Sequence, residues 1–335
     1  METEKFNYHL PRKLIARYPL ERGTERLLVV ERHTGRIRHL QFQDILSYLH
    51  PGDVLVMNDT KVIPARLMGR KETGGSVEVL LLKRIEGARW RCLASASKRT
   101  RPGALISFGE KLTAVVEQKE GNEFVLDFSD EARVLTEGRV PLPPYIDREP
   151  EDLDREAYQT IYARHDGSIA SPTAGLHFTR DMLGRISSSG IELVYVTLHV
   201  GPGTFTPVRT ASVEEHTMHD EEFFVSDEAA KAVQTAIAQK RRIVAVGTTT
   251  TRVLEHLLRS RGKVVPGRGS TDIFIYDGFD FRAVDVLLTN FHLPCSTLLM
   301  LVSAFAGHEL VMKAYHEAVE QRYRFFSYGD AMLII

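Results

Sequence analysis

The pattern of apolar residues changes at about residue 66, and this change constrains the fold more than any other feature of the sequence. Between Arg66 and Ser129 the apolar residues occur in short β-type runs without a helical period. The strands expected in this segment are 77–85, 89–94, 112–117 and 123–128, with hairpin turns at 86–87 and 120–122. Successive short strands without helices predict a small antiparallel barrel or sandwich.

Strands and helices alternate after the proline-rich break at residues 141–144. The expected helices are 180–188, 226–240, 249–260, 297–306 and 309–322. The expected strands are 191–200, 242–247, 272–276 and 284–289, and a further buried strand, 53–58, precedes the β-rich segment. The prediction is therefore an α/β fold, a mixed sheet with flanking helices, formed by residues 1–65 and 143–335. A small antiparallel all-β barrel-like domain, residues 66–142, is inserted in it.

Composition excludes several classes of protein. With 335 residues the chain is long enough for two domains, and its net charge of −1 means that any nucleic-acid binding must come from local patches. Cys92 and Cys295 are the only cysteines, which argues against iron–sulfur and thiolate zinc sites. The N-terminus has no hydrophobic leader, and the longest apolar run, 298–307, is half of the roughly 20 residues that a membrane helix needs. We expect a cytoplasmic protein without membrane association.

Several histidines lie in phrases rich in Thr, Asn, Gly and Pro. His177 ends Ser-Pro-Thr-Ala-Gly-Leu-His, His199 precedes Gly-Pro-Gly, His216 and His219 form a His-x-x-His pair, and His292 follows Thr-Asn-Phe. Imidazoles in rigid loops at strand ends favour a reaction site, because they exchange a proton near neutral pH. The alternative is buried histidines that only satisfy a loop hydrogen bond. A His-x-x-His pair alone does not make a metal site, so we expect no metal.

Two further patterns point to anion binding. The segment 244–252 reads as a strand, a glycine turn and the start of a helix with four threonines, where free N–H groups favour an anion. Helix capping by these threonines is the alternative. Basic clusters occur at 98–101, 240–242 and 259–263. They could contact nucleic-acid phosphates or simply be solvated surface.

These phrases resemble one family in their order along the chain, the S-adenosylmethionine:tRNA ribosyltransferase-isomerases of queuosine biosynthesis. The resemblance extends from Asn58-Asp-Thr-Lys-Val-Ile-Pro-Ala-Arg-Leu67 to Arg324-Phe-Phe-Ser-Tyr-Gly-Asp-Ala-Met-Leu-Ile334. It implies transfer and isomerisation of the ribosyl part of S-adenosylmethionine onto the aminomethyl-deazaguanine base (preQ1) at the tRNA wobble position. Epoxyqueuosine-tRNA forms, and adenine and methionine leave. The implied partners are this tRNA and S-adenosylmethionine as co-substrate, with no permanently bound cofactor; the oligomeric state stays open.

The positions that match the family's motifs imply the site residues. Candidates for proton transfer are His177, His199, His219 and His292. Candidates for substrate binding are Thr60, Lys61, Arg66, Thr248, Thr249, Asp272, Asn290, Arg324, Tyr328 and Asp330. Arg259, Arg261 and Lys263 are the candidates for tRNA binding. Two other functions stay open: an S-adenosylmethionine-dependent tRNA methyltransferase, for which no glycine-rich cofactor loop is evident, and a non-catalytic tRNA-binding protein.

Overall fold

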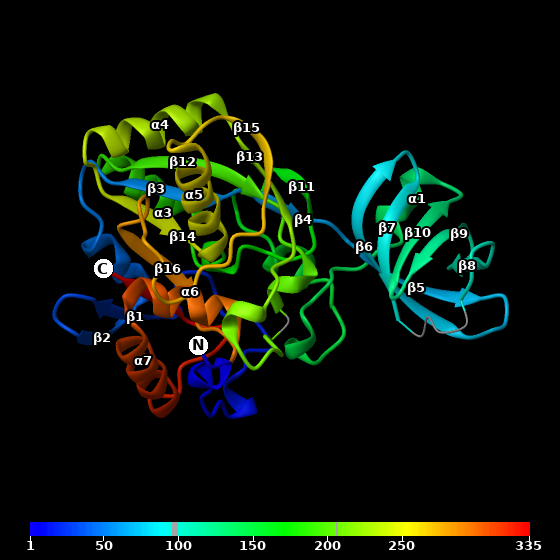
Figure 1. Cartoon of the computed structure of the whole chain (residues 1–335), viewed down its shortest axis with the longest axis horizontal. Helices are drawn as coiled ribbons and strands as arrows, with labels where there is room; N and C mark the ends of the chain where they lie inside the picture. Colours follow the sequence, from blue (N-terminus) through cyan, green and yellow to red (C-terminus); the bar gives the residue numbers. More distant parts are fainter. Residues whose placement is uncertain (96–99, 206) are drawn as a thin grey trace.

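The computed structural model describes residues 1–95, 100–205 and 207–335, so Lys98 and Arg99 of the first basic cluster lie outside the described residues. A large α/β body and a separate small barrel are connected by two chain segments (Figure 1). The body contains a nine-stranded mixed sheet with flanking helices, and the barrel is a closed antiparallel one. The predicted fold class is confirmed.

The central strands of the body are parallel and end at one edge of the sheet. The strand order is β15 (Gly267–Thr271), β13 (Glu221–Val225), β12 (Glu192–Leu198), β3 (Val54–Asn58), β14 (Ile243–Val246), β16 (Val286–Asn290), β17 (Ala331–Ile334), β1 (Arg26–Glu31) and β2 (Arg36–Gln41). β12, β3, β14 and β16 pair in parallel. β17 runs antiparallel to β16 and parallel to β1, so the amino ends of β17 and β1 lie at the same edge.

Helices cover both faces of this sheet, which explains the continuous apolar runs of its central strands. Val54 and Val56 belong to the core that includes α4 (Asp227–Ala238), α5 (Thr248–Arg261), α6 (Thr297–Ala306) and α7 (His308–Glu320). Leu55 and Met57 point the other way, into the core with α3 (Arg180–Ser188) and the 3-10 helix η3 (Phe42–Ser47). No single described helix is long and apolar enough to span a membrane, although α6 and α7, bent by 117°, pass that test as a pair by length and composition.

The barrel closes through six strands around its own core. Their order is β10 (Glu123–Phe128), β7 (Arg89–Ala94), β6 (Ser76–Glu86), β5 (Arg66–Lys71), β8 (Leu105–Phe108) and β9 (Leu112–Glu120). Alternate residues such as Val77, Val79 and Leu81 face inward. Helix α1 (Glu131–Thr136) follows, capped by Asp130. Closure leaves no open sheet edge. We propose residues 66 and 142 as the limits of this inserted domain.

One predicted strand is wrong, and several strands were not predicted. Residues 272–276 are not a strand; the strand is β15, directly before them, which pairs with β13. The Phe223 ring of β13 covers Gly269, where a Cβ would lie 2.6 Å from ring atom Cζ. The pairing therefore requires a small residue, and the glycines that permit it make the segment look like a loop. β1, β2, β5, β8, β13 and β17 were also missed, as were the short strands β4 (Thr60–Val62) and β11 (His165–Ser168), which pair with each other.

The segments that leave and re-enter the body pack tightly against each other. Arg66 and Arg139 form an isolated antiparallel bridge, and a Cβ at Gly138 would lie 1.8 Å from the carbonyl oxygen of Pro64. Backbone must move to accept any side chain at position 138.

We therefore expect Gly138→Ala to destabilise the protein by about 1–3 kcal/mol, the usual cost of overpacking. Thermal unfolding would measure this. Gly184→Ala is the matched control, because a Cβ at this position of α3 has no neighbour within 4 Å, and we expect it to be neutral or stabilising. Equal melting temperatures for the two variants would show that the connection is not tightly packed.

Candidate active site

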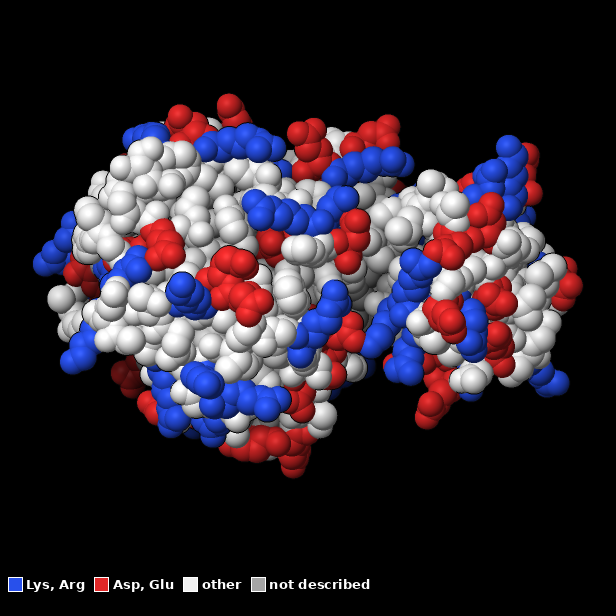
Figure 2. Space-filling view, turned by 90° about the horizontal axis from the view of Figure 1, so that it is seen from above, with Lys and Arg blue, Asp and Glu red and all other residues white. Residues whose placement is uncertain are grey.

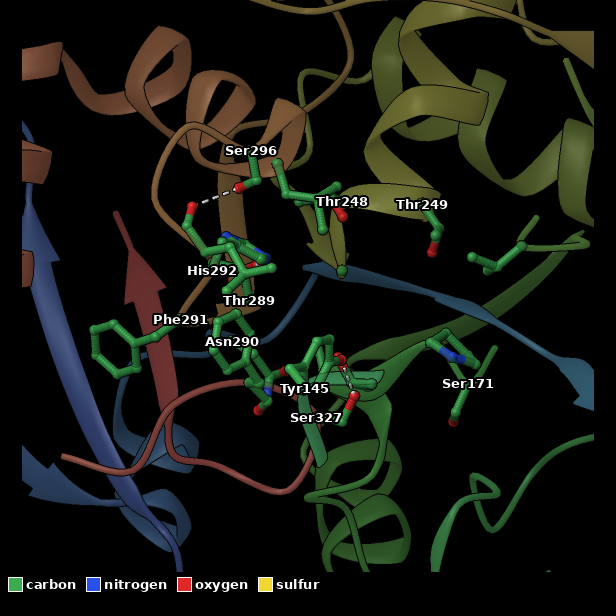
Figure 3. A pocket seen from close by; sticks show the side chains of 18 residues that line it. Tyr145, Ser171, Thr248, Thr249, Thr289, Asn290, Phe291, His292, Ser296 and Ser327 are labelled. Atoms are coloured by element: carbon green, nitrogen blue, oxygen red, sulfur yellow. Dashed lines mark hydrogen bonds between the residues drawn. The ribbon is translucent and has the colours of Figure 1, made fainter. Parts of the chain in front are cut away.

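A narrow cavity lies where the parallel strands end, and Figure 3 shows side chains from several strand ends and loops converging on it. In open α/β sheets this edge is where ligands bind. Its lining comprises Tyr145, Ser171, Pro172, Thr173, Ala174, Val200, Gly247, Thr248, Thr249, Thr289, Asn290, Phe291, His292, Leu293, Ser296, Leu298, Phe326 and Ser327. Of the predicted site residues, Thr248, Thr249, Asn290 and His292 thus come together here.

Helix α5 begins at the cavity wall with an uncapped N-terminus. Gly247 adopts φ 90° at the N-cap position, and no described side chain caps the helix. The hydroxyls of Thr250 and Thr251 donate to the carbonyls of Val246 and Gly247, 2.9 and 3.2 Å away. Thr248 and Thr249 line the cavity instead. First-turn N–H groups and the helix dipole therefore favour an anion at this wall.

The buried Asn58 side chain ties three elements of the site together. Its Nδ2 donates to the Leu198 carbonyl at 3.0 Å and to Thr249 Oγ1 at 3.2 Å. Its Oδ1 accepts from the backbone N–H groups of Leu198 at 3.0 Å and Thr60 at 3.1 Å. With 1% of its surface exposed, this amide fixes the ends of β3 and β12 and the first turn of α5.

The opposite wall is an aromatic loop held in an unusual conformation. Tyr145 stacks on Phe326 with ring centroids 4.4 Å apart, and its hydroxyl lies 2.7 Å from Ser327 Oγ. Phe326 has φ 71°, which is costly for a bulky residue. Asn290 Nδ2 donates to the Phe326 carbonyl at 3.1 Å and so supports this conformation. Burial raises the pKa of Tyr145, which keeps its hydroxyl protonated.

Two of the four candidate histidines are deeply buried. His177 Nε2 lies 3.2 Å from Asn290 Nδ2, and its Nδ1 lies 3.4 Å from Glu25 Oε1. Because the amide donates to Nε2, the proton of a neutral ring is on Nδ1. His292 lines the cavity, bonded to Thr289 Oγ1 and the Tyr315 hydroxyl, and burial lowers its pKa to about 3. Both histidines are placed to orient neighbouring polar groups.

The other two candidates line a second space, a cleft between the body and the barrel. His199 Nδ1 lies 2.8 Å from Thr60 Oγ1, and a Cβ on Gly167, which has φ 146°, would lie 2.9 Å from the imidazole. Burial lowers the pKa of His199, against an opposing effect of Glu222. His219 packs on Gly203 in the same cleft. Val200 lines both the cleft and the cavity, so His199 lies at their junction.

Three predicted substrate-binding residues are engaged in other contacts near the edge. Asp330, 1% exposed, accepts from the backbone N–H groups of Arg26 and Arg324 at 2.9 and 2.7 Å. The Arg324 guanidinium donates to the carbonyl of Tyr18. The Tyr328 hydroxyl donates to Asp154 Oδ1 at 2.7 Å. These contacts hold the chain on either side of Phe326.

The remaining predicted residues are spread more widely. Thr60 touches His199, Lys61 pairs with Asp166 at 3.1 Å, and Arg66 pairs with Glu78 in the barrel at 2.8 Å. Asp272 is exposed after β15. Arg259, Arg261 and Lys263 lie at the far end of α5, about 20 Å from Thr248 for a helix of 14 residues. No group of three or more His, Cys, Asp or Glu within the described residues could hold a metal ion.

Sequence reasoning missed Asn58, Tyr145, Ser171 and Ser327 as site residues. Asn58 and Ser327 lie inside the two phrases that carried the family resemblance, and Ser171 lies in the His177 phrase. The signal was therefore present, but a motif alone does not show which of its polar residues face the cavity. Tyr145, after the proline-rich break, had no comparable signal.

Comparison with known proteins shows the family to which the chain belongs. The family model described as queuosine biosynthesis protein matches residues 3–334. Proteins named S-adenosylmethionine:tRNA ribosyltransferase-isomerase from Symbiobacterium thermophilum and Pelobacter propionicus are 52% and 50% identical, with full coverage of both chains. The chain belongs to this family. A crystal structure of S-adenosylmethionine tRNA ribosyltransferase from Thermotoga maritima is 39% identical, with a TM-score of 0.58, 99% of this chain covered and 100% of that one.

In this family member, Asn58 should matter for both folding and ligand binding. We expect Asn58→Ala to destabilise the protein by about 1–3 kcal/mol for each buried backbone group left unsatisfied, and to weaken S-adenosylmethionine binding because Thr249 loses its donor. Chemical denaturation and calorimetric titration would measure the two effects. Asn7→Ala is the control, since Asn7 is exposed and its side-chain amide donates to Glu4, three residues away. A variant that matches wild type in both measurements would contradict this role.

Proposed function

We propose that this chain transfers and isomerises the ribosyl part of S-adenosylmethionine onto preQ1 at the wobble position of tRNA, giving epoxyqueuosine-tRNA, adenine and methionine. The observation that carries the proposal is the junction at Val200. There a largely apolar, partly aromatic cavity with a few hydroxyl and amide groups meets an open cleft containing His199 and His219. A small co-substrate and a large nucleic acid need two adjoining spaces of this kind.

The cavity suits S-adenosylmethionine in its chemistry. The uncapped first turn of α5 with Thr248 and Thr249 would take the methionine carboxylate. The Tyr145–Phe326 pair would pack against the adenine. The cavity volume of about 60 Å³ is well below the roughly 300–1,000 Å³ of sites that enclose small molecules, so binding would require the cavity to widen, and we propose that the aromatic wall is the part that moves.

The reaction needs a base for the carbon beside the sulfonium and a neutral amine on the incoming base. Among the candidate histidines, His199 fits proton transfer best. Its lowered pKa keeps it neutral near pH 7, its Nδ1 is fixed by Thr60, and it faces the cleft at the junction. His292, with a pKa near 3, and His177, behind Asn290, fit positioning roles instead.

The product analysis separates this function from the alternatives. Incubation with preQ1-containing tRNA should release adenine and methionine in equal amounts, and omission of the tRNA should abolish both. Chromatography of the small molecules measures this. Release of S-adenosylhomocysteine would instead identify a methyltransferase, and absence of any product would favour a non-catalytic tRNA-binding protein.

We expect His199→Ala to lower turnover by about 100-fold or more, the usual effect of losing an acid–base group. The neutral imidazole is the active form, so wild-type kcat/KM should be constant above the lowered pKa of His199 and fall as the pH drops through it. This acid limb should disappear in the variant. Steady-state kinetics across pH, with S-adenosylmethionine affinity and melting temperature, would test this.

His33→Ala is a suitable control, because His33 is exposed in the turn between β1 and β2 and belongs to none of the motifs. If His199→Ala loses stability and cofactor affinity together, His199 only anchors its loop. If it turns over near the wild-type rate, His219 becomes the better candidate.

A further inference from the structure

We infer that the tRNA lies in the cleft with its phosphates on the barrel and its modified base toward the body. The inserted barrel would thus be the phosphate-binding part of the enzyme. This inference rests on the proposed function and assigns the surface that the RNA uses.

The two walls of the cleft carry opposite charge. The cleft, of about 670 Å³, is lined on the barrel side by Lys83, Arg84 and Arg91, here called the basic wall, together with Glu123. On the body side it is lined by Asp166, Asp220 and Glu222, here called the acidic wall. Figure 2 shows Lys and Arg side chains gathered on the barrel edge that faces the body. The whole chain has a net charge of only −1, so this separation is local.

The arrangement of the basic wall lowers the stability of the barrel. Lys83 and Arg91 are directly opposite each other on β6 and β7, and like charges at such positions are destabilising. The register shifts on both sides of this pair, between Leu81 and Lys83 and between Arg84 and Glu86. Such bulges redirect side chains, which lets the neighbours Lys83 and Arg84 both line the cleft. A bound polyanion would offset the repulsion.

Two of the three residues of the basic wall, Lys83 and Arg91, are available to phosphate, whereas Arg84 pairs with Glu131 on the barrel itself. Arg91 is exposed and forms no ion pair with any residue that the structure describes. Lys83 pairs with Glu222 across the cleft, but the two side chains are 60% and 54% exposed. Exposed pairs of this kind contribute little. A phosphate can therefore replace Glu222 as the partner of Lys83.

The acidic wall sets the orientation of the RNA. It repels phosphates, so the backbone belongs on the barrel and the base on the body. His199 lies on this body side, next to the cavity.

The cluster of Arg259, Arg261 and Lys263 is the competing surface. It lies one helix length from the cavity, and Arg259 packs over the Phe279 ring, 5.4 Å from its centroid. A wobble base that reaches the junction at Val200 has its neighbouring phosphates within the cleft. We therefore assign the main phosphate contacts to the basic wall.

The test compares salt dependence of tRNA binding in three variants. Lys83→Ala/Arg91→Ala should weaken binding and reduce the slope of log affinity against log salt by about 1.4, for two contacts to single-stranded phosphates. Arg70→Ala/Lys111→Ala removes two exposed basic side chains of the barrel that lie outside the cleft, and should leave the slope unchanged. The charge-conserving Lys83→Arg/Arg91→Lys variant should restore the wild-type slope. Fluorescence anisotropy with preQ1-containing tRNA provides the measurement.

S-adenosylmethionine affinity should be unchanged in all three variants, and the melting temperature should not fall in any of them; in Lys83→Ala/Arg91→Ala it should be equal or higher, because the repulsion between the two charges is removed. The inference is overturned if the cleft variant keeps the wild-type slope, or if the control pair lowers it equally. A reduced slope on replacing Arg259, Arg261 and Lys263, without one for the cleft pair, would assign the RNA to that cluster. Failure of the proposed function would look different, since wild-type protein would then release neither adenine nor methionine.

Discussion

The hydrogen bonds of the Asn58 amide are the interaction on which the site depends. A strand ladder aligns β3 with β12 only up to the last paired residue, Asn58 with Val196. Beyond that pair the regular ladder ends, and one chain continues through Thr60 to the barrel while the other continues through His199. The amide continues the ladder with a side chain, binding Leu198 on one side and Thr249 on the other. The loop histidine and the first turn of α5 are thereby held in one frame.

A buried ion pair fixes the boundary between the cavity and the cleft. The buried Arg252 guanidinium pairs with Glu221, whose other oxygen accepts the Gly201 N–H at 3.0 Å. Both side chains are almost fully buried, so removing either one would leave an uncompensated charge. Helix α5 is thus tied to the glycine loop after Val200. The cavity and the cleft therefore meet at a boundary that buried contacts hold in place.

Much of the fold is predictable from local sequence, and the failures have particular causes. The ranges of α3, α6, β7 and β10 follow directly from hydrophobic period and turn residues. β15 does not, because Gly269 serves the Phe223 ring of a partner strand that is distant in sequence. β17 is a short terminal run whose partners, β1 and β16, lie at opposite ends of the chain. Pairings of this kind are tertiary.

The site shows the same limit. Motif phrases locate Thr248, Thr249, Asn290 and His292, which do line the cavity. They do not distinguish His177, sealed between Glu25 and Asn290, from His199, which faces a cleft, because burial depends on distant segments. Nor do they reveal that Asp330 already satisfies two backbone N–H groups. Residue type indicates the possible chemistry, and packing decides which residues are free to perform it.

The central claim is that the co-substrate lies in the cavity, with its sulfonium near the junction at Val200. A crystal structure with S-adenosylmethionine tests this most directly. The account predicts the methionine carboxylate on the first-turn N–H groups and hydroxyls of Thr248 and Thr249, the adenine against a displaced Tyr145–Phe326 wall, and the ribose toward His199. A co-substrate bound with its carboxylate away from α5, or wholly within the cleft against the barrel, would contradict it.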